Sequence, residues 1–168
     1  MTRPLLAAAL SAALFASPAA TPALADNAML NVIASGMVGA DRPLTRAYAI
    51  CLLGAGQIDP VAEGLAEMGF QREDDTEMGV TYLAAPDAPY SVALYQDGAI
   101  CDVTSETNGT DEALMSLVVL GGMTGFENVD TECTAMRLGG VLAEVTSSGN
   151  DPDCYDDDTS NVRFTFGN

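Results

Sequence analysis

Four cysteines carry the most specific chemistry in this sequence. Cys51, Cys101, Cys133 and Cys154 form an even set, and all of them lie after residue 25. In an exported chain, an even set of this size predicts two disulfides, with three possible connectivities. The sequence has no CxxC motif, and the spacings do not match zinc knuckles or ribbons. We therefore interpret the four cysteines as structural cross-links.

A second candidate group lies in an acidic loop near the C-terminus. The loop reads SGNDPDCYDDDTS, and its carboxylates belong to Asp151, Asp153, Asp156, Asp157 and Asp158. Calcium prefers such oxygen ligands and takes roughly six to eight of them. The loop does not fit the EF-hand pattern, because it lacks a glycine at the turning position and a glutamate at the end. A solvated loop is the favoured interpretation, and a calcium-stabilised structural or adhesive domain is the alternative.

Catalytic chemistry has little support in the residue types. The chain contains no histidine, which excludes Ser-His and Cys-His nucleophiles and imidazole metal ligands. No P-loop or dinucleotide-binding fingerprint is present. Among 24 acids some pair always falls at a separation suited to glycoside cleavage. We expect no enzyme, no cofactor and no metal; a carboxylate-based hydrolase is a weaker alternative, with candidate acids Glu63, Glu67, Asp102 and Glu106.

Other polar and aromatic candidates are weaker still. Ser35 and Ser148 lack the GxSxG elbow of serine hydrolases. Asn108-Gly109-Thr110 fits a glycosylation sequon, which has little meaning if the export signal is bacterial. Aromatic residues on strands usually pack within the sheet, although they can also line a binding surface. The candidates of this kind are Tyr82, Tyr90 and Tyr95.

Residues 1–25 predict export, because they have the composition of a cleavable signal peptide. Arg3 provides the charged region, a short apolar run follows, and Ala23-Leu24-Ala25 forms a small-residue cleavage site. The apolar run is about half the length that a membrane span needs, so we expect no span after cleavage. Residues 26–168 would then form a single periplasmic or secreted domain.

The charge of the mature chain is strongly acidic. Five arginines and no lysine stand against 24 acids, a net charge of −19. Such a surface repels nucleic acid and anionic membranes and attracts cationic partners, most strongly at low salt. A soluble surface is the simplest interpretation. A basic exported protein is the partner class that we expect if the charge serves recognition.

Hydrophobic periodicity and turn residues predict helices and strands that alternate in two similar blocks. The first block has a helix from Asp41 to Gly54, a second from Asp59 to Gly69, and then a polar connector over 71–79. We expect strands in both blocks and, between them, a buried and almost wholly apolar helix that Thr110 caps. The expected strands cover 80–84, 90–96, 99–103, 133–138, 141–147 and 162–166.

The hairpin at Asp97-Gly98 fixes the most informative register. A two-residue turn there pairs Leu94 with Cys101, which places Cys101 on the core face. Cys51 lies on the buried stripe of the first helix, whereas Cys133 falls on the polar face of its hairpin, near the loop that carries Cys154. The favoured disulfides are therefore Cys51–Cys101 and Cys133–Cys154.

The expected fold class is α+β, with a largely antiparallel sheet of about six strands and helices on one face. Two α-β-β-β halves, stapled by the two disulfides, would build it. Elimination of catalytic chemistry then favours an exported, non-enzymatic binding or interaction domain with an acidic surface. One specific form is an inhibitor of a cationic cell-wall enzyme.

Overall fold

The computed structural model describes residues 42–122, 126–149 and 152–167. The expected signal peptide (1–25), the segment 26–41 and Asp151 of the acidic loop lie outside these residues. The described parts contain three α-helices, eight strands and one 3-10 helix. In chain order they are α2 (Pro43–Gly54), α3 (Ile58–Ala66), β1 (Gln71–Asp75), β2 (Val80–Ala84), β3 (Tyr90–Tyr95), η1 (Gln96–Gly98), β4 (Ile100–Ser105), α4 (Thr110–Gly121), β5 (Glu127–Asp130), β6 (Thr134–Leu138), β7 (Val141–Thr146) and β8 (Ser160–Phe166).

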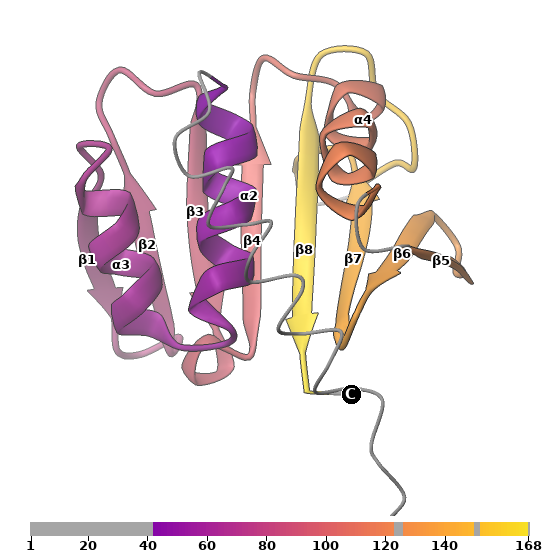
Figure 1. Ribbon diagram of the computed structural model, residues 1–168. Coiled ribbons are helices and arrows are strands. Elements are labelled where there is room, and N and C mark those ends of the chain that lie inside the picture. Colours follow the sequence, from indigo (N-terminus) through magenta and orange to yellow (C-terminus); the bar gives the residue numbers. More distant parts are fainter. Residues whose placement is uncertain (1–41, 123–125, 150–151, 168) are drawn as a thin grey trace, which may run out of the picture.

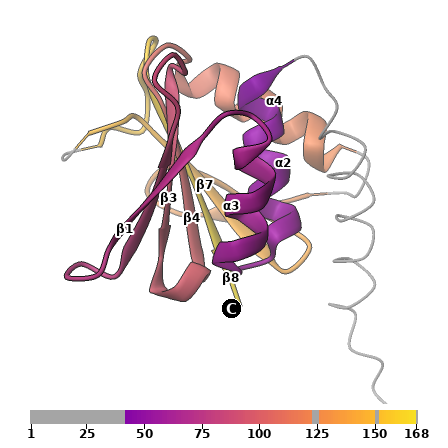
Figure 2. The same cartoon turned by 90° about the vertical axis from the view of Figure 1, so that its left-hand side faces the viewer.

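The strands form one antiparallel sheet, in the order β1-β2-β3-β4-β8-β7-β6-β5. The helices α2, α3 and α4 all pack on one side of it (Figure 1, Figure 2). The α+β class is confirmed, but the sheet has eight strands rather than about six. Within the described residues, no helix has the length and apolar character needed to cross a membrane.

The two halves of the sheet follow the same plan. In the first half, α2 and α3 precede four strands, and in the second half α4 precedes four strands. The last strands of the halves, β4 and β8, pair at the centre of the sheet, and the first strands, β1 and β5, form its edges. Each half therefore has four strands, one more than predicted, preceded by two helices in the first half and by one in the second.

The two extra strands are β1 and β5, whose residues carry no apolar alternation. β1 reads QREDD and β5 reads ENVD, and nearly all of these side chains are exposed. The segment over 71–79 was predicted as a connector because a strand is normally detected by its buried face. An edge strand in this position is held by its backbone pairing with one neighbour, which leaves no signal in the side-chain pattern.

The core lies between the sheet and the helices. The predicted inward faces are correct: Val92, Leu94, Cys101 and Val103 are buried on β3 and β4, as are the inward residues of β6, β7 and β8. At the centre of the core, the ring of Tyr48 on α2 contacts that of Phe164 on β8 edge-on, with centroids 5.8 Å apart. This packing fixes α2 over the seam between the halves.

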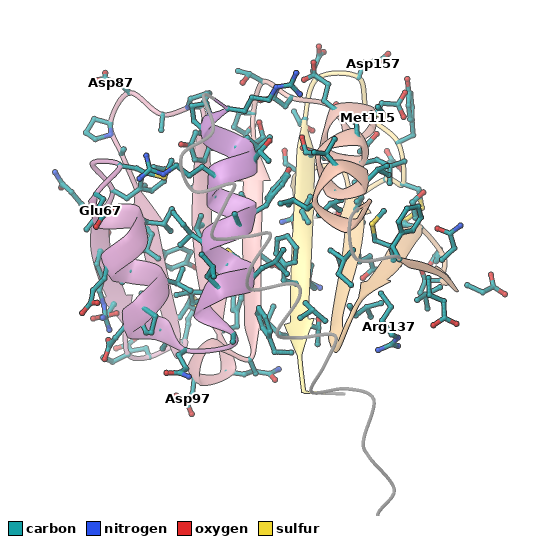
Figure 3. All side chains as sticks on the ribbon, in the orientation of Figure 1. Glu67, Asp87, Asp97, Met115, Arg137 and Asp157 are labelled. Atoms are coloured by element: carbon teal, nitrogen blue, oxygen red, sulfur yellow. A yellow bond between two sulfur atoms is a disulfide. The ribbon has the colours of Figure 1, made fainter. Side chains whose placement is uncertain are left out.

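Three local predictions are corrected. The loop after β3 runs over four residues, 96–99, with Gln96, Asp97 and Gly98 all at positive φ, although the register is as predicted. Helix α4 begins after Gly109, so Thr110 is a helical residue and not the cap. Its outer side is also exposed rather than buried: Met115 is 62 % and Val119 51 % accessible, and Figure 3 shows Met115 on the outer side of α4.

Close contact between α2 and α3 leads to the first prediction. A Cβ added at Gly54 would lie 2.1 Å from Cγ2 of the buried Val61, whereas one at Gly64 would meet Ile50 Cγ2 at 3.0 Å. Gly54→Ala should therefore destabilise the protein by about 2 kcal/mol through overpacking. Gly64→Ala should be close to neutral, because helix propensity offsets a small shift of Ile50. Urea unfolding of both variants measures the difference; equal stabilities would contradict the packing.

Candidate functional site

The face of the sheet opposite the helices is not covered by any described helix (Figure 2). Strand alternation places polar and aromatic side chains on it. Register aligns one row of these residues across five neighbouring strands. From β2 to β7 the row consists of Tyr82, Ala93, Asp102, Arg163 and Glu144. We call this side of the sheet the open face.

The centre of the open face is an ion pair between β4 and β8. Arg163 donates from Nε to Oδ1 of Asp102 and from Nη2 to Oδ2, both at 3.0 Å. Asp102 is only 3 % exposed, whereas the Arg163 side chain is 51 % exposed. The hydrogen bonds to Asp102, with smaller contributions from its charge and that of Glu144, raise the pKa of Arg163 above its usual value. Asp102, a candidate catalytic acid in the sequence, is thus held as an ion-pair partner.

Tyr95 lies beside this pair, and Tyr82 lies near Tyr95. Tyr95 is half-buried on β3, and burial, followed by the nearby Asp102 charge, raises its pKa; the Tyr82 phenol adds a smaller contribution. Tyr82 on β2 is exposed. The third candidate, Tyr90, points to the opposite side of the sheet and packs against Phe70, with ring centroids 5.2 Å apart. Two of the three tyrosines therefore belong to the open face and one to the core.

Arg163 also lines two hollows of the open face. One, of about 470 Å³, lies between the ends of β7 and β8 and the loop after β7, and Glu132, Glu144 and Asp153 supply its carboxylates. The other, of about 350 Å³, lies towards η1 and includes Tyr95 and Ile100. The open face therefore has two concave sites, and both are lined by the guanidinium of Arg163.

The wall of the larger hollow is rigidly attached to the sheet. The Cys133–Cys154 disulfide joins the start of β6 to the loop after β7. In the same loop, the backbone N–H of Ser147 donates to the Asp153 carbonyl at 2.7 Å, and the Asp153 N–H donates to Ser147 Oγ at 2.8 Å. These contacts hold the hollow in a preformed shape, which lowers the entropic cost of binding.

Both disulfides are present, and they join the cysteines in the favoured pairing. Cys51 and Cys101 are fully buried and connect α2 to β4, whereas Cys133 and Cys154 lie at the surface. Among the described residues no cysteine is free. The two cross-links suggest folding in an oxidising environment.

The acidic loop is organised by its own backbone contacts. The Asp156 side chain accepts hydrogen bonds from the N–H groups of Asp158 and Thr159, which lower its pKa. Its carbonyl accepts from the N–H of Thr110, at the start of α4. Across residues 42–122, 126–149 and 152–167, no group of three or more acidic, cysteine or histidine side chains is arranged to hold a metal ion.

The remaining acids proposed for hydrolysis do not share a site with Asp102. Glu63 lies on α3 and Glu67 directly after it, on the helix side, where Glu67 approaches Arg46 at 3.7 Å. Glu106 follows β4, and Asp102 lies on the other side of the sheet in its ion pair. Ser35 lies outside the described residues, and Asn108 of the sequon hydrogen-bonds to Glu112. Ser148 lies after β7, where its N–H donates to Thr159 Oγ1.

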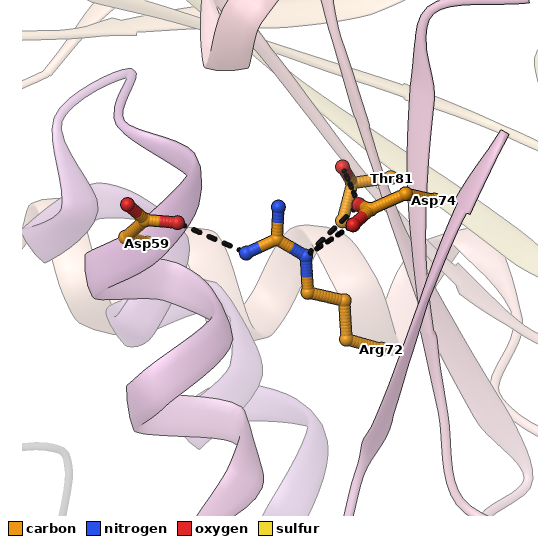
Figure 4. A network of polar contacts seen from close by, with 4 residues as sticks. All are labelled: Asp59, Arg72, Asp74 and Thr81. Carbon is orange, nitrogen blue, oxygen red and sulfur yellow. Dashed lines mark hydrogen bonds and ion pairs between the residues drawn. The ribbon is translucent and has the colours of Figure 1, made fainter. Parts of the chain in front are cut away.

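A second ion-pair network lies on the helix side and attaches the edge strand β1 to α3 (Figure 4). Arg72 contacts Asp59 on α3 at 2.9 Å and Asp74 on its own strand at 2.9 Å. Thr81 on β2 donates to Asp74 at 2.6 Å. This hydroxyl, followed by the Arg72 guanidinium, lowers the pKa of Asp74. The charged groups of this network are exposed to solvent.

Tyr48 gives a pH-dependence prediction. Burial raises the pKa of its phenol well above the usual value, and a nearby Ser160 lowers it slightly. The unfolded phenol ionises near pH 10, while the folded one stays protonated. The stability that depends on a neutral Tyr48 is therefore complete below about pH 10 and decreases above it, by roughly 1 kcal/mol per pH unit.

The matching variant is Tyr48→Phe, because no hydrogen bond of ordinary geometry joins the Tyr48 hydroxyl to a described residue. We expect wild-type and variant proteins to have similar unfolding free energies at pH 8. Above pH 10 the variant should lose stability less steeply in urea titrations. Tyr82→Phe, at an exposed position, should keep the wild-type slope. Parallel curves for wild type and Tyr48→Phe would contradict the assignment.

Comparison with protein-family models, with curated proteins and with solved structures finds no match at the thresholds applied. The candidate site therefore rests on the geometry alone. Sequence reasoning identified Asp102 and the tyrosines individually, but not the Asp102–Arg163 pair. That pair depends on which strand neighbours β4, and the chain separates β4 from β8 by more than fifty residues.

Proposed function

We propose that this protein is an exported, non-enzymatic interaction domain that binds a basic protein partner. The observation that carries the proposal is the excess of negative charge that the fold leaves uncompensated. In the described residues, three arginines form ion pairs, with Glu67, Asp59, Asp74 and Asp102 as their partners. Most of the acids in the described parts of the chain therefore have no arginine of those parts in an ion pair with them.

Export is supported by two independent features. The two disulfides suit an oxidising compartment, and the first 25 residues have the composition of a signal peptide. In the periplasm or outside the cell, a domain of this charge meets cationic exported proteins directly. Its field would accelerate their association and weaken as salt is added. An inhibitor of a cationic cell-wall enzyme is the specific form that we favour.

The test uses purified mature protein and a panel of cationic exported enzymes, a lysozyme-type muramidase among them. Calorimetry at about 50 and 150 mM salt measures binding. We expect at least one folded member to bind with one-to-one stoichiometry at the higher salt and more tightly at the lower. Poly-lysine serves as an unstructured control for charge alone. Binding to poly-lysine with no saturable binding to any folded enzyme would overturn the proposal.

A further inference from the structure

We propose that the basic partner docks on the open face of the sheet, with Tyr82, Tyr95 and the Asp102–Arg163 pair at the centre of the contact. This inference rests on the proposed function and specifies where that function is carried out. It assigns the helix layer no part in primary recognition.

The open face has the dimensions of a protein interface. Eight strands of four to seven residues form it. With strands about 4.8 Å apart and residues about 3.3 Å apart, it spans roughly 34 Å by 17 Å. A partner in a stable complex contributes about 800 Å² of accessible surface, and a face of this span with its side chains is of that order. No helix among the described residues covers it (Figure 1, Figure 2).

The centre of the open face has the composition of a binding hot spot. Tyrosine and arginine dominate such centres, because they combine large contact area with directed hydrogen bonding. Tyr82 is exposed and Tyr95 half-buried; Tyr95 lies near the guanidinium of Arg163, and Tyr82 lies near Tyr95. The two hydrogen bonds that Arg163 donates to Asp102 fix the guanidinium before any partner arrives. The hollows on either side of Arg163 offer room for anchoring side chains.

Charge selects a basic partner for this face. Because Asp102 balances Arg163, the carboxylates around the centre remain in excess. Glu73 and Asp75 lie at the β1 edge and Glu144 beside Arg163, and Glu132 and Asp153 line the larger hollow. Lysine or arginine side chains of a partner would meet these carboxylates around an aromatic centre. Such complementarity favours both rapid encounter and correct orientation.

Two other docking modes are the alternatives to the open face. Addition of a partner strand at an edge is disfavoured, because the edge strands β1 and β5 carry acidic, exposed side chains, which is a known means of preventing another strand from adding to a sheet. The helix side is the second alternative: Met115 and Val119 are exposed on α4, with Asp111 and Glu112 in its first turn. The experiment therefore compares the open face with the helix side.

Two pairs of substitutions make the comparison. Ser91→Arg on the open face and Ala66→Arg on α3 each add one positive charge at an exposed position, without removing a core contact. Tyr82→Ala and Met115→Ala each remove an exposed apolar side chain, from the open face and from α4. Thermal melts verify folding. The probe is the cationic enzyme that binds the wild-type protein best at about 150 mM salt.

The expected result is a loss of affinity of about tenfold or more for Ser91→Arg and Tyr82→Ala. Ala66→Arg and Met115→Ala should change the dissociation constant by less than about threefold. If Ser91→Arg and Ala66→Arg weaken the affinity equally, the interaction depends on overall charge, and the proposal that the partner docks on the open face is overturned. Weakening by Met115→Ala alone would assign the partner to α4. If no enzyme binds the wild-type protein, the proposed function itself fails.

Discussion

Replacing both Cys51 and Cys101 by alanine will lower the free energy of unfolding by about 4 kcal/mol. The two residues are 50 positions apart, so the cross-link removes a large number of conformations from the unfolded chain. Both side chains are fully buried, and the bond joins α2 to β4 beneath the first half of the core. A domain of this size has a total stability of about 5 to 15 kcal/mol, so the variant should be close to unfolding at 37 °C.

The matched control replaces Cys133 and Cys154, which close a shorter loop and lie at the surface. We expect a loss of about 3 kcal/mol, because loop entropy grows only slowly with length. Under mild reduction, the exposed cross-link should open first, while the buried one stays intact until the protein unfolds. Urea titrations and timed alkylation measure both. Reduction of Cys51–Cys101 ahead of Cys133–Cys154 in the folded protein would contradict the structure.

Arg163→Met will destabilise the protein by about 2 kcal/mol. The substitution leaves the Asp102 carboxylate, only 3 % exposed, without its two hydrogen bonds from the guanidinium. Breaking a fully buried pair typically costs about 3 to 5 kcal/mol. We expect less here because the Arg163 side chain is half-exposed and water reaches it.

The control for this prediction is Arg72→Met. Arg72 also contacts two carboxylates, but its network is exposed, so its loss should change stability much less. Adding Asp102→Asn to Arg163→Met should recover part of the lost stability, because the double variant has no isolated buried charge. Urea unfolding of the four proteins at pH 7 gives the values. Equal losses for Arg163→Met and Arg72→Met would show that Asp102 is solvated.

The strands that the sequence predicts are those with one buried face. The alternation in β3, β7 and β8 comes from burying every second side chain, and hairpin turns then set the register. β1 and β5 bury almost nothing, so their residue types are those of a loop. The exposed side of α4 was not predicted, because the helix is apolar almost all round and such a pattern predicts full burial. Only one side of α4 packs against the sheet, so some of its apolar residues remain exposed.

The candidate site could be predicted only in part. Within one hairpin, register places Tyr95 opposite Ile100 and Leu94 opposite Cys101, which is how the Cys51–Cys101 pairing was inferred. The pairing of β4 with β8 crosses the two halves of the chain, and no local pattern encodes it. The sequence therefore predicts only that Arg163 is an outward-facing residue of the last strand. Its role at the centre of the open face emerges only when the sheet is assembled.

The most direct test of the account is a methyl NMR titration of the protein with its cationic partner. Ala93, Ile100 and Leu142 carry methyl groups on the open face, whereas Met115 and Val119 carry them on the outer side of α4. Docking on the open face predicts saturable shift changes at the first three residues and unchanged signals at Met115 and Val119. Changes confined to Met115 and Val119, with Ala93, Ile100 and Leu142 unaffected, would contradict it.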